Sequence, residues 1–154
     1  MRKVIIFAII LSLLAICSIS IAEEVKRTAV VAEVKGTVDV KTADGNWTAA
    51  KTGMVLNQGD IIRTKEGSSA ILNVDGTAQT ATVQVKEKSQ LMLAELIMNK
   101  DDNSQKTTLD LALGEILVKA KKLHSEKSSF EVKTPTSVAA VRGTSFSVSV
   151  EAME

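Results

Sequence analysis

Apolar and polar residues alternate along much of the chain after residue 22. The alternation is clear at residues 38–41, 116–121 and 130–133. It is clearest at residues 146–150, where a phenylalanine and two valines are separated by serines. Successive side chains of a strand point to opposite faces, so a period of two predicts strands with one buried face. The chain is therefore predicted to be all-β.

Glycines recur at positions 36, 45, 53, 59, 67 and 76, a spacing typical of short strands joined by tight turns. Asp44-Gly45 and Asp75-Gly76 are hairpin signals. Residues 89–98 fit a helical period as well as a strand, and propensity favours a helix, but the surrounding strands favour a strand. Residues 99–106 are the most polar run of the chain and are predicted to form a solvated loop. The alternative, a calcium site, is disfavoured because the run lacks the glycine and closing glutamate of a calcium loop.

Residues 1–22 are typical of a helical secretory signal. Arg2 and Lys3 precede a long apolar run, and Ser20 and Ala22 supply small residues before Glu23. The alternative is a retained anchor, because residues 4–22 approach the length that spans a bilayer. We expect cleavage, which leaves one domain at residues 23–154 in the periplasm or outside the cell.

Cys17 lies in a sequence, LAIC, that resembles a bacterial lipobox, but Ile16 stands where a small residue is normal. We interpret Cys17 as an apolar residue within the signal and acylation as the alternative. The exported domain then has no disulfide, and burial alone must stabilise it. Membrane contact is expected only if the signal is retained or Cys17 is acylated.

Composition after residue 22 argues against a nucleic-acid partner. Removing the signal takes two of the 19 basic residues and none of the 18 acidic ones, so the net charge becomes 17 minus 18, or −1. The remaining aromatic residues are Trp47, Phe130 and Phe146. Nucleic-acid binding favours an excess of basic residues and aromatic residues that stack on bases. The same scarcity of aromatic residues argues against a carbohydrate-binding platform, for which Trp47 is the one candidate.

Candidate catalytic chemistry is sparse. His124 is the only histidine, and its spacing to other residues matches no metal or nucleophile motif. No phosphate-binding loop, dinucleotide fingerprint or serine nucleophile elbow is present. We therefore expect no enzyme activity, metal or cofactor; an envelope hydrolase is the last hypothesis.

Three stretches carry information beyond periodicity: GTV at residues 36–38, GDIIRT at 59–64 and TPTSVAAVRGTSF at 134–146. Together they resemble the FecR-like domain family over about residues 30–150. The residues that carry this resemblance are Gly36, Gly59, Asp60, Arg63, Thr64, Thr134, Pro135, Val141, Arg142, Gly143, Thr144 and Phe146.

These motifs have mainly structural interpretations. Gly59 and Asp60 suit a turn in which the carboxylate accepts backbone N–H groups. Pro135 predicts a strand end or edge. Residues 138–141 are apolar and are expected to be buried, so Arg142 would need a partner, with Asp60 the first candidate. The alternative role for Arg142 is binding an anion or a peptide carboxylate.

Four lysines near one another in the sequence, Lys119, Lys121, Lys122 and Lys127, form a candidate basic patch. Such a patch would face anionic envelope polymers or lipid. The alternative is a solvated strand face that opposes edge pairing.

The resemblance implies a fold and a cellular setting. The best-known relatives are membrane regulators that restrain a sigma factor and sense an outer-membrane transporter. Because three residues precede the apolar run, we expect a stand-alone β domain instead. The relatives imply short stacked antiparallel strands in one domain, and we favour a twisted solenoid-like form over a sandwich-like one.

The sequence leaves two main functional hypotheses. The first is a non-enzymatic binding module of the bacterial cell envelope, whose partner is a protein or polymer, with strand addition at an open edge as one mode. The second is a periplasmic sensory component that signals through a separate membrane partner.

Overall fold

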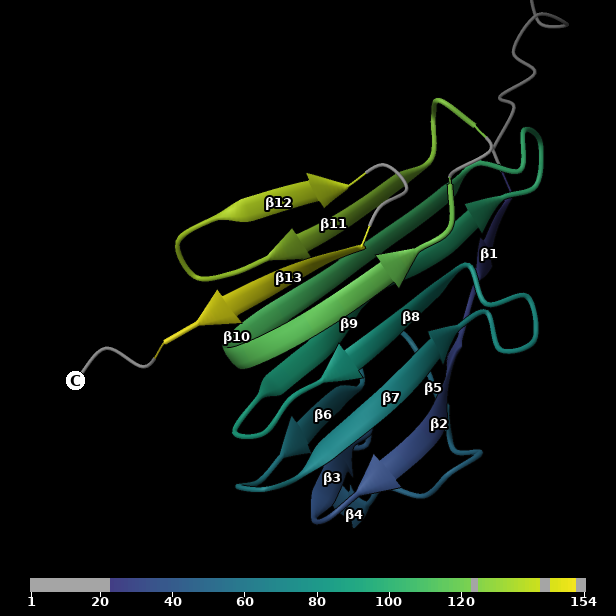
Figure 1. Cartoon of the computed structure of the whole chain (residues 1–154). Coiled ribbons are helices and arrows are strands. Elements are labelled where there is room, and N and C mark those ends of the chain that lie inside the picture. The colour runs from purple at the N-terminus through teal and green to yellow at the C-terminus, as the bar shows by residue number, and fades with distance from the viewer. Residues whose placement is uncertain (1–22, 123–124, 142–144, 152–154) are drawn as a thin grey trace, which may run out of the picture.

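The computed structural model describes residues 23–122, 125–141 and 145–151. The predicted signal, Cys17, His124 and residues 142–144 therefore lie outside the described residues. Within them, all regular elements are strands (Figure 1). The strands are β1 (Glu24–Lys26), β2 (Ala29–Lys35), β3 (Val38–Lys41), β4 (Trp47–Ala49), β5 (Val55–Leu56), β6 (Ile61–Thr64), β7 (Ser69–Val74), β8 (Ala81–Val85), β9 (Gln90–Asn99), β10 (Gln105–Ala120), β11 (Ser129–Lys133), β12 (Val138–Val141) and β13 (Ser145–Val150).

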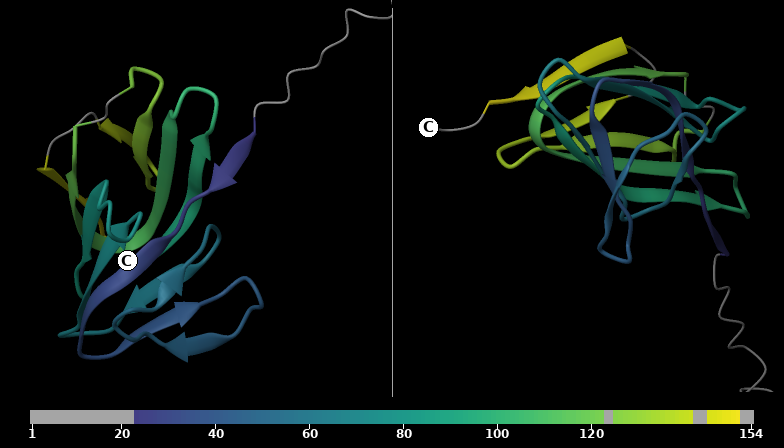
Figure 2. Two further views of the ribbon diagram at one scale, coloured as in Figure 1. Left: turned by 90° about the vertical axis from the view of Figure 1, so that its right-hand side faces the viewer. Right: turned by 90° about the horizontal axis from the view of Figure 1, so that it is seen from below.

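The strands form one sheet that curls into a half-barrel (Figure 2). Its main order is β4-β3-β6-β9-β10-β8-β7-β2-β5. The first half of β10 pairs with β9 and β11, and its second half pairs with β8 and β13. Every pairing is antiparallel except that of β10 with β11. The curled sheet therefore has two layers that share the 16-residue strand β10. One layer contains β1, β3, β4, β6, β9, β11 and β12, and the other contains β2, β5, β7, β8 and β13.

Alternate side chains of most strands fill the space between the layers. In β7 and β8 these are alanines, valines and a leucine, and all of them are buried. The core is almost entirely aliphatic, with Phe130 as its one buried aromatic residue among those described. The alternation in the sequence therefore corresponds to side chains that point alternately to the inner and the outer face of the sheet.

β10 passes from one layer to the other at Gly114. Gly114 has a φ of +92°, and a Cβ there would overlap the backbone and side chain of Ser89. The Ser89 hydroxyl accepts the Glu115 N–H at 2.9 Å. Thr64 accepts the Ser89 N–H at 3.0 Å and donates to Lys86 O. This close approach fixes the β8–β9 turn against the bend in β10.

A buried ion pair holds the opposite end of the half-barrel. Arg27, between β1 and β2, donates to Asp75 through Nε at 2.7 Å and through Nη2. It also donates to Thr107 on β10 and to Thr80, each at 3.0 Å. The Arg27 and Asp75 side chains are 6% and 15% exposed. Three segments far apart in the sequence therefore meet at one guanidinium: the residues before β2, the β7–β8 turn and β10.

The all-β prediction is confirmed, and residues 89–98 form a strand as their context indicated. Asp44-Gly45 and Asp75-Gly76 lie in the β3–β4 and β7–β8 hairpin turns. The arrangement differs from a solenoid, because the strand order departs from chain order, whereas solenoid repeats contact sequence neighbours. The described part of the chain contains no helix of the length and hydropathy needed to cross a bilayer.

The prediction that residues 138–141 are buried is wrong. Val138 is 62% exposed, and the remaining residues of β12 are exposed or half-buried. β12 pairs only with β11 among the described strands, so it lies at an edge of the sheet. An apolar composition alone could not distinguish this edge from a core strand.

Gly114→Ala is expected to destabilise the protein by about 3 kcal/mol, because it combines backbone strain with overlap against Ser89. Gly45→Ala is the matched control: its φ is +85°, but nothing lies within 4 Å of the added Cβ. Strain alone should cost about 1 kcal/mol there. Urea unfolding measures both, and equal losses would contradict the close approach.

Arg27→Met is expected to cost about 3 kcal/mol, because it leaves the Asp75 carboxylate buried without its partner. Adding Asp75→Ala should recover part of this loss. As a control, Lys100→Met breaks the exposed pair with Glu23 and should cost less than about 1 kcal/mol. Urea unfolding of the double-mutant cycle checks the coupling, and simple additivity would argue against it.

Candidate functional site

The β11–β12 hairpin extends the sheet beyond β10 and ends in an open edge (Figure 1). β11 lies parallel to the first half of β10, and β12 folds back antiparallel to β11. At the turn, the Thr134 N–H donates to Ser137 O at 2.8 Å. The Ser137 N–H donates to Thr134 Oγ1 at 2.9 Å. Pro135 lies between them, at a strand end as predicted.

The register determines which backbone groups of β12 face outwards. Thr134 and Ser137 form a hydrogen-bonded pair, and such pairs alternate along an antiparallel ladder. Ala139 and Val141 therefore bond to β11. The N–H and C=O groups of Val138 and Ala140 point away from it, where no described strand pairs with them.

The side chains of β12 leave this edge unprotected. Edge strands normally carry charges, a proline or a covering segment that prevents further pairing. β12 has the sequence VAAV, and Val138 is the most exposed of the large apolar residues described. The other edge strand nearby, β13, differs because Phe146, Val148 and Val150 pack against the core. β12 therefore presents an uncharged edge that another strand can join.

A cavity of about 430 Å³ adjoins this edge. Its lining combines apolar and charged residues: Glu126, Lys127, Ser128, Ser129, Phe130, Glu131, Ala140 and Val141. Phe130 also meets Phe146 edge to face, with ring centroids 6.4 Å apart, which joins the hairpin to β13. The edge therefore combines free backbone groups with a space that can receive a side chain.

The earlier motif, residues 59–64, is placed at the junction of β6 and β9. The Gly59 N–H donates to Leu93 O at 2.7 Å, and the buried Asp60 carboxylate accepts the Asn57 N–H at 2.8 Å. This is the turn expected for Gly59 and Asp60. Asp60 is the predicted partner of Arg142, which lies outside the described residues. Thr64 fixes the β8–β9 turn.

Arg63 lies on the outer face of the sheet, apart from β12. Its guanidinium stacks over the Trp47 ring at 4.0 Å from the centroid and lies 3.4 Å from an Asp39 carboxylate oxygen. Its Nε is buried without a hydrogen-bond partner among the described residues. Gly36 is a packing position, because a Cβ there would lie 2.5 Å from Ser68 Oγ.

The four lysines of the candidate basic patch have different surroundings. Lys121 and Lys122 line a shared cavity at the end of the half-barrel. Lys127 forms an ion pair with Asp102 at 2.9 Å. Lys119 is exposed on β10, away from that cavity's lining.

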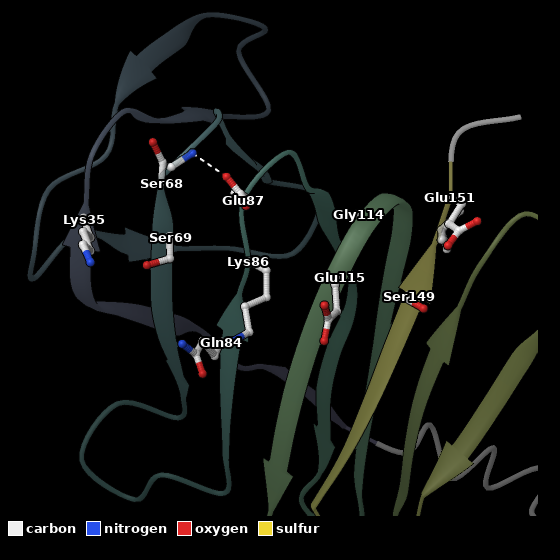
Figure 3. Close-up of a pocket in the computed structure, with 12 residues that line it drawn as sticks. Lys35, Ser68, Ser69, Gln84, Lys86, Glu87, Gly114, Glu115, Ser149 and Glu151 are labelled. Carbon is white, nitrogen blue, oxygen red and sulfur yellow. Dashed lines mark hydrogen bonds between the residues drawn. The ribbon is translucent and has the colours of Figure 1, made fainter. Parts of the chain in front are cut away.

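Sequence reasoning missed a groove of about 570 Å³ that crosses one layer (Figure 3). Lys35, Ser69, Lys86, Glu115 and Ser149 contribute to it from five neighbouring strands or the turns after them. Figure 3 places the lysines on one side and Glu115 with Glu151 on the other. The residues that line this groove are far apart in the sequence, so no local motif predicts it. No group of three or more potential metal ligands occurs among the described residues.

Comparison with family models assigns this chain to a protein family. A family model described as FecR protein matches residues 60–154, more than half of the chain, and the chain therefore belongs to the FecR family. This confirms the resemblance drawn from the motifs, although residues 30–59 precede the matched range. No curated protein and no solved structure matches the chain.

The β9–β10 turn supplies a test of local electrostatics. Hydrogen bonds from Ser104 and then the Lys127 ammonium lower the pKa of Asp102 from 3.8 to about 2. A lowered folded-state pKa stabilises the protein above the unfolded value, and this contribution disappears as pH falls through about 2. Lys127→Gln should raise the Asp102 pKa part of the way in an NMR titration. Lys88→Gln, which loses a pair with Glu66, should leave it unchanged.

Proposed function

We propose that this protein is an exported, non-enzymatic binding module of the bacterial cell envelope. It binds an extended segment of another envelope protein by strand addition at β12. The observation that carries this proposal is the edge formed by Val138–Val141, which carries no charge and which no other described strand pairs with. Export rests on the signal-like residues 1–22.

Strand addition divides recognition between backbone and side chains. The free groups of Val138 and Ala140 would bond to the added strand, which supplies affinity largely independent of its sequence. The adjoining cavity, with Phe130 and Val141 beside Glu126 and Glu131, would select its side chains. An extended protein segment satisfies both features, whereas a polysaccharide has no regular ladder of N–H and C=O groups.

The second candidate is a periplasmic sensory component acting through a separate membrane partner. FecR-family membership supports it, because FecR domains are associated with periplasmic sensory signalling. The two candidates share a binding step at the domain surface. They differ in the partner: a membrane signalling protein would favour the sensory role.

Ala140→Pro tests the proposed edge. Proline removes an outward N–H for which the described part of the chain holds no acceptor, so the fold should persist while strand addition is lost. The matched control is Ala49→Pro on the edge strand β4. Ala50 donates to Val38 O, so the Ala49 N–H likewise points outwards.

A photo-crosslinking residue at position 138 in intact cells provides the measurement. We expect a discrete protein adduct that Ala140→Pro reduces at least about tenfold and Ala49→Pro leaves unchanged. Adducts with glycan instead, or equal loss in both variants, would argue against strand addition. Mass spectrometry of the same material shows whether the chain begins at Glu23, Cys17 or Met1.

A further inference from the structure

A second, separate cavity lies at the end of the half-barrel where β8 begins and β10 ends. Its volume is about 380 Å³, within the range of small-ligand sites. It is lined by Ala78, Thr80, Asn103, Gln105, Lys121, Lys122, Ser125 and Ser128. Seven of these eight residues carry polar or cationic side chains, and none carries a carboxylate. The β7–β8 turn, the β9–β10 turn and the segment between β10 and β11 converge to build it.

The donors of this cavity exceed what the protein itself uses. Lys121 Nζ donates to Ala78 O at 2.8 Å, which leaves further N–H groups on that ammonium. Lys122 makes no hydrogen bond or ion pair with the described residues, and neither do the side-chain amides of Asn103 and Gln105. The Ser128 hydroxyl accepts the Gln105 N–H at 3.0 Å, so its proton remains available.

Neighbouring acids do not cancel this positive charge. Asp75, bonded to Thr80 of the lining, is neutralised by Arg27. Asp102, beside Asn103, is paired with Lys127. Glu126 lines the other cavity, beside β12, and Asp101 lies outside the lining of this one. The charged residues of the lining are therefore the two lysines.

We propose that this cavity binds an oxyanion of the phosphate class. Lys121 and Lys122 supply charge, and the amides and serine hydroxyls supply directed donors, a combination that suits a group with several acceptor oxygens. The phosphate can belong to a lipid headgroup or to a soluble or polymeric phosphate ester. This site is independent of the strand edge at β12.

The test is an NMR titration of the purified full-length protein with inorganic phosphate, against chloride at matched ionic strength. We expect saturable shifts of the Thr80, Ser125 and Ser128 amides. Lys121→Gln with Lys122→Gln should weaken binding at least about tenfold. Lys122→Gln alone breaks no hydrogen bond or ion pair among the described residues. It should weaken binding less, and it guards against a folding defect.

The groove in Figure 3 supplies the matched control. Lys35→Gln with Lys86→Gln removes the same charge elsewhere on the surface and should change the affinity less than about twofold. Equal weakening by both pairs, or no saturable shift in the unaltered protein, would overturn the proposal. Lysine-dependent binding to phosphatidylglycerol but not phosphatidylcholine vesicles would assign the phosphate to lipid, and phosphate binding without vesicle binding would assign it to a soluble or polymeric ester.

Discussion

At Gly114 a single strand leaves one layer of the sheet and enters the other. Before this residue β10 pairs with β9 and β11, and after it with β8 and β13. A side chain at position 114 would collide with Ser89, so the bend requires a residue without a Cβ. Because both layers are attached to β10, the half-barrel and its aliphatic core depend on this approach.

The ends of the half-barrel are held by polar contacts rather than by the core. At one end Thr64 and Ser89 secure the β8–β9 turn, and at the other Arg27 joins Asp75, Thr80 and Thr107. Each group has its hydrogen-bond partner, which limits the cost of burying it. The β11–β12 hairpin is attached outside this framework through β11. Changes to β12 can therefore alter its edge without disturbing the body of the domain.

The sequence predicted features that depend on local pattern. Alternation identified strands, and Asp-Gly pairs located the hairpin turns, because side-chain direction and turn conformation are set by neighbouring residues. It could not predict the strand order, the parallel pairing of β11, or the Arg27–Asp75 pair, whose partners are 48 residues apart. The prediction that residues 138–141 are buried is wrong for the same reason. A run of valine and alanine fits a core strand or a bare edge, and only the tertiary arrangement decides between them.

The family motifs thus divide into two physical roles. Gly59, Asp60 and Thr64 build turns near the bend, and the hydrogen bonds that they form are made within the domain. The closing motif contains a strand whose outward backbone groups are not met within the described structure. Uncovered apolar edges promote aggregation, so a stable domain is expected to blunt them. β12 is not blunted by charge, proline or a covering segment among the described residues. This contrast makes the edge easier to explain as a surface that a partner covers than as a structural requirement of the fold.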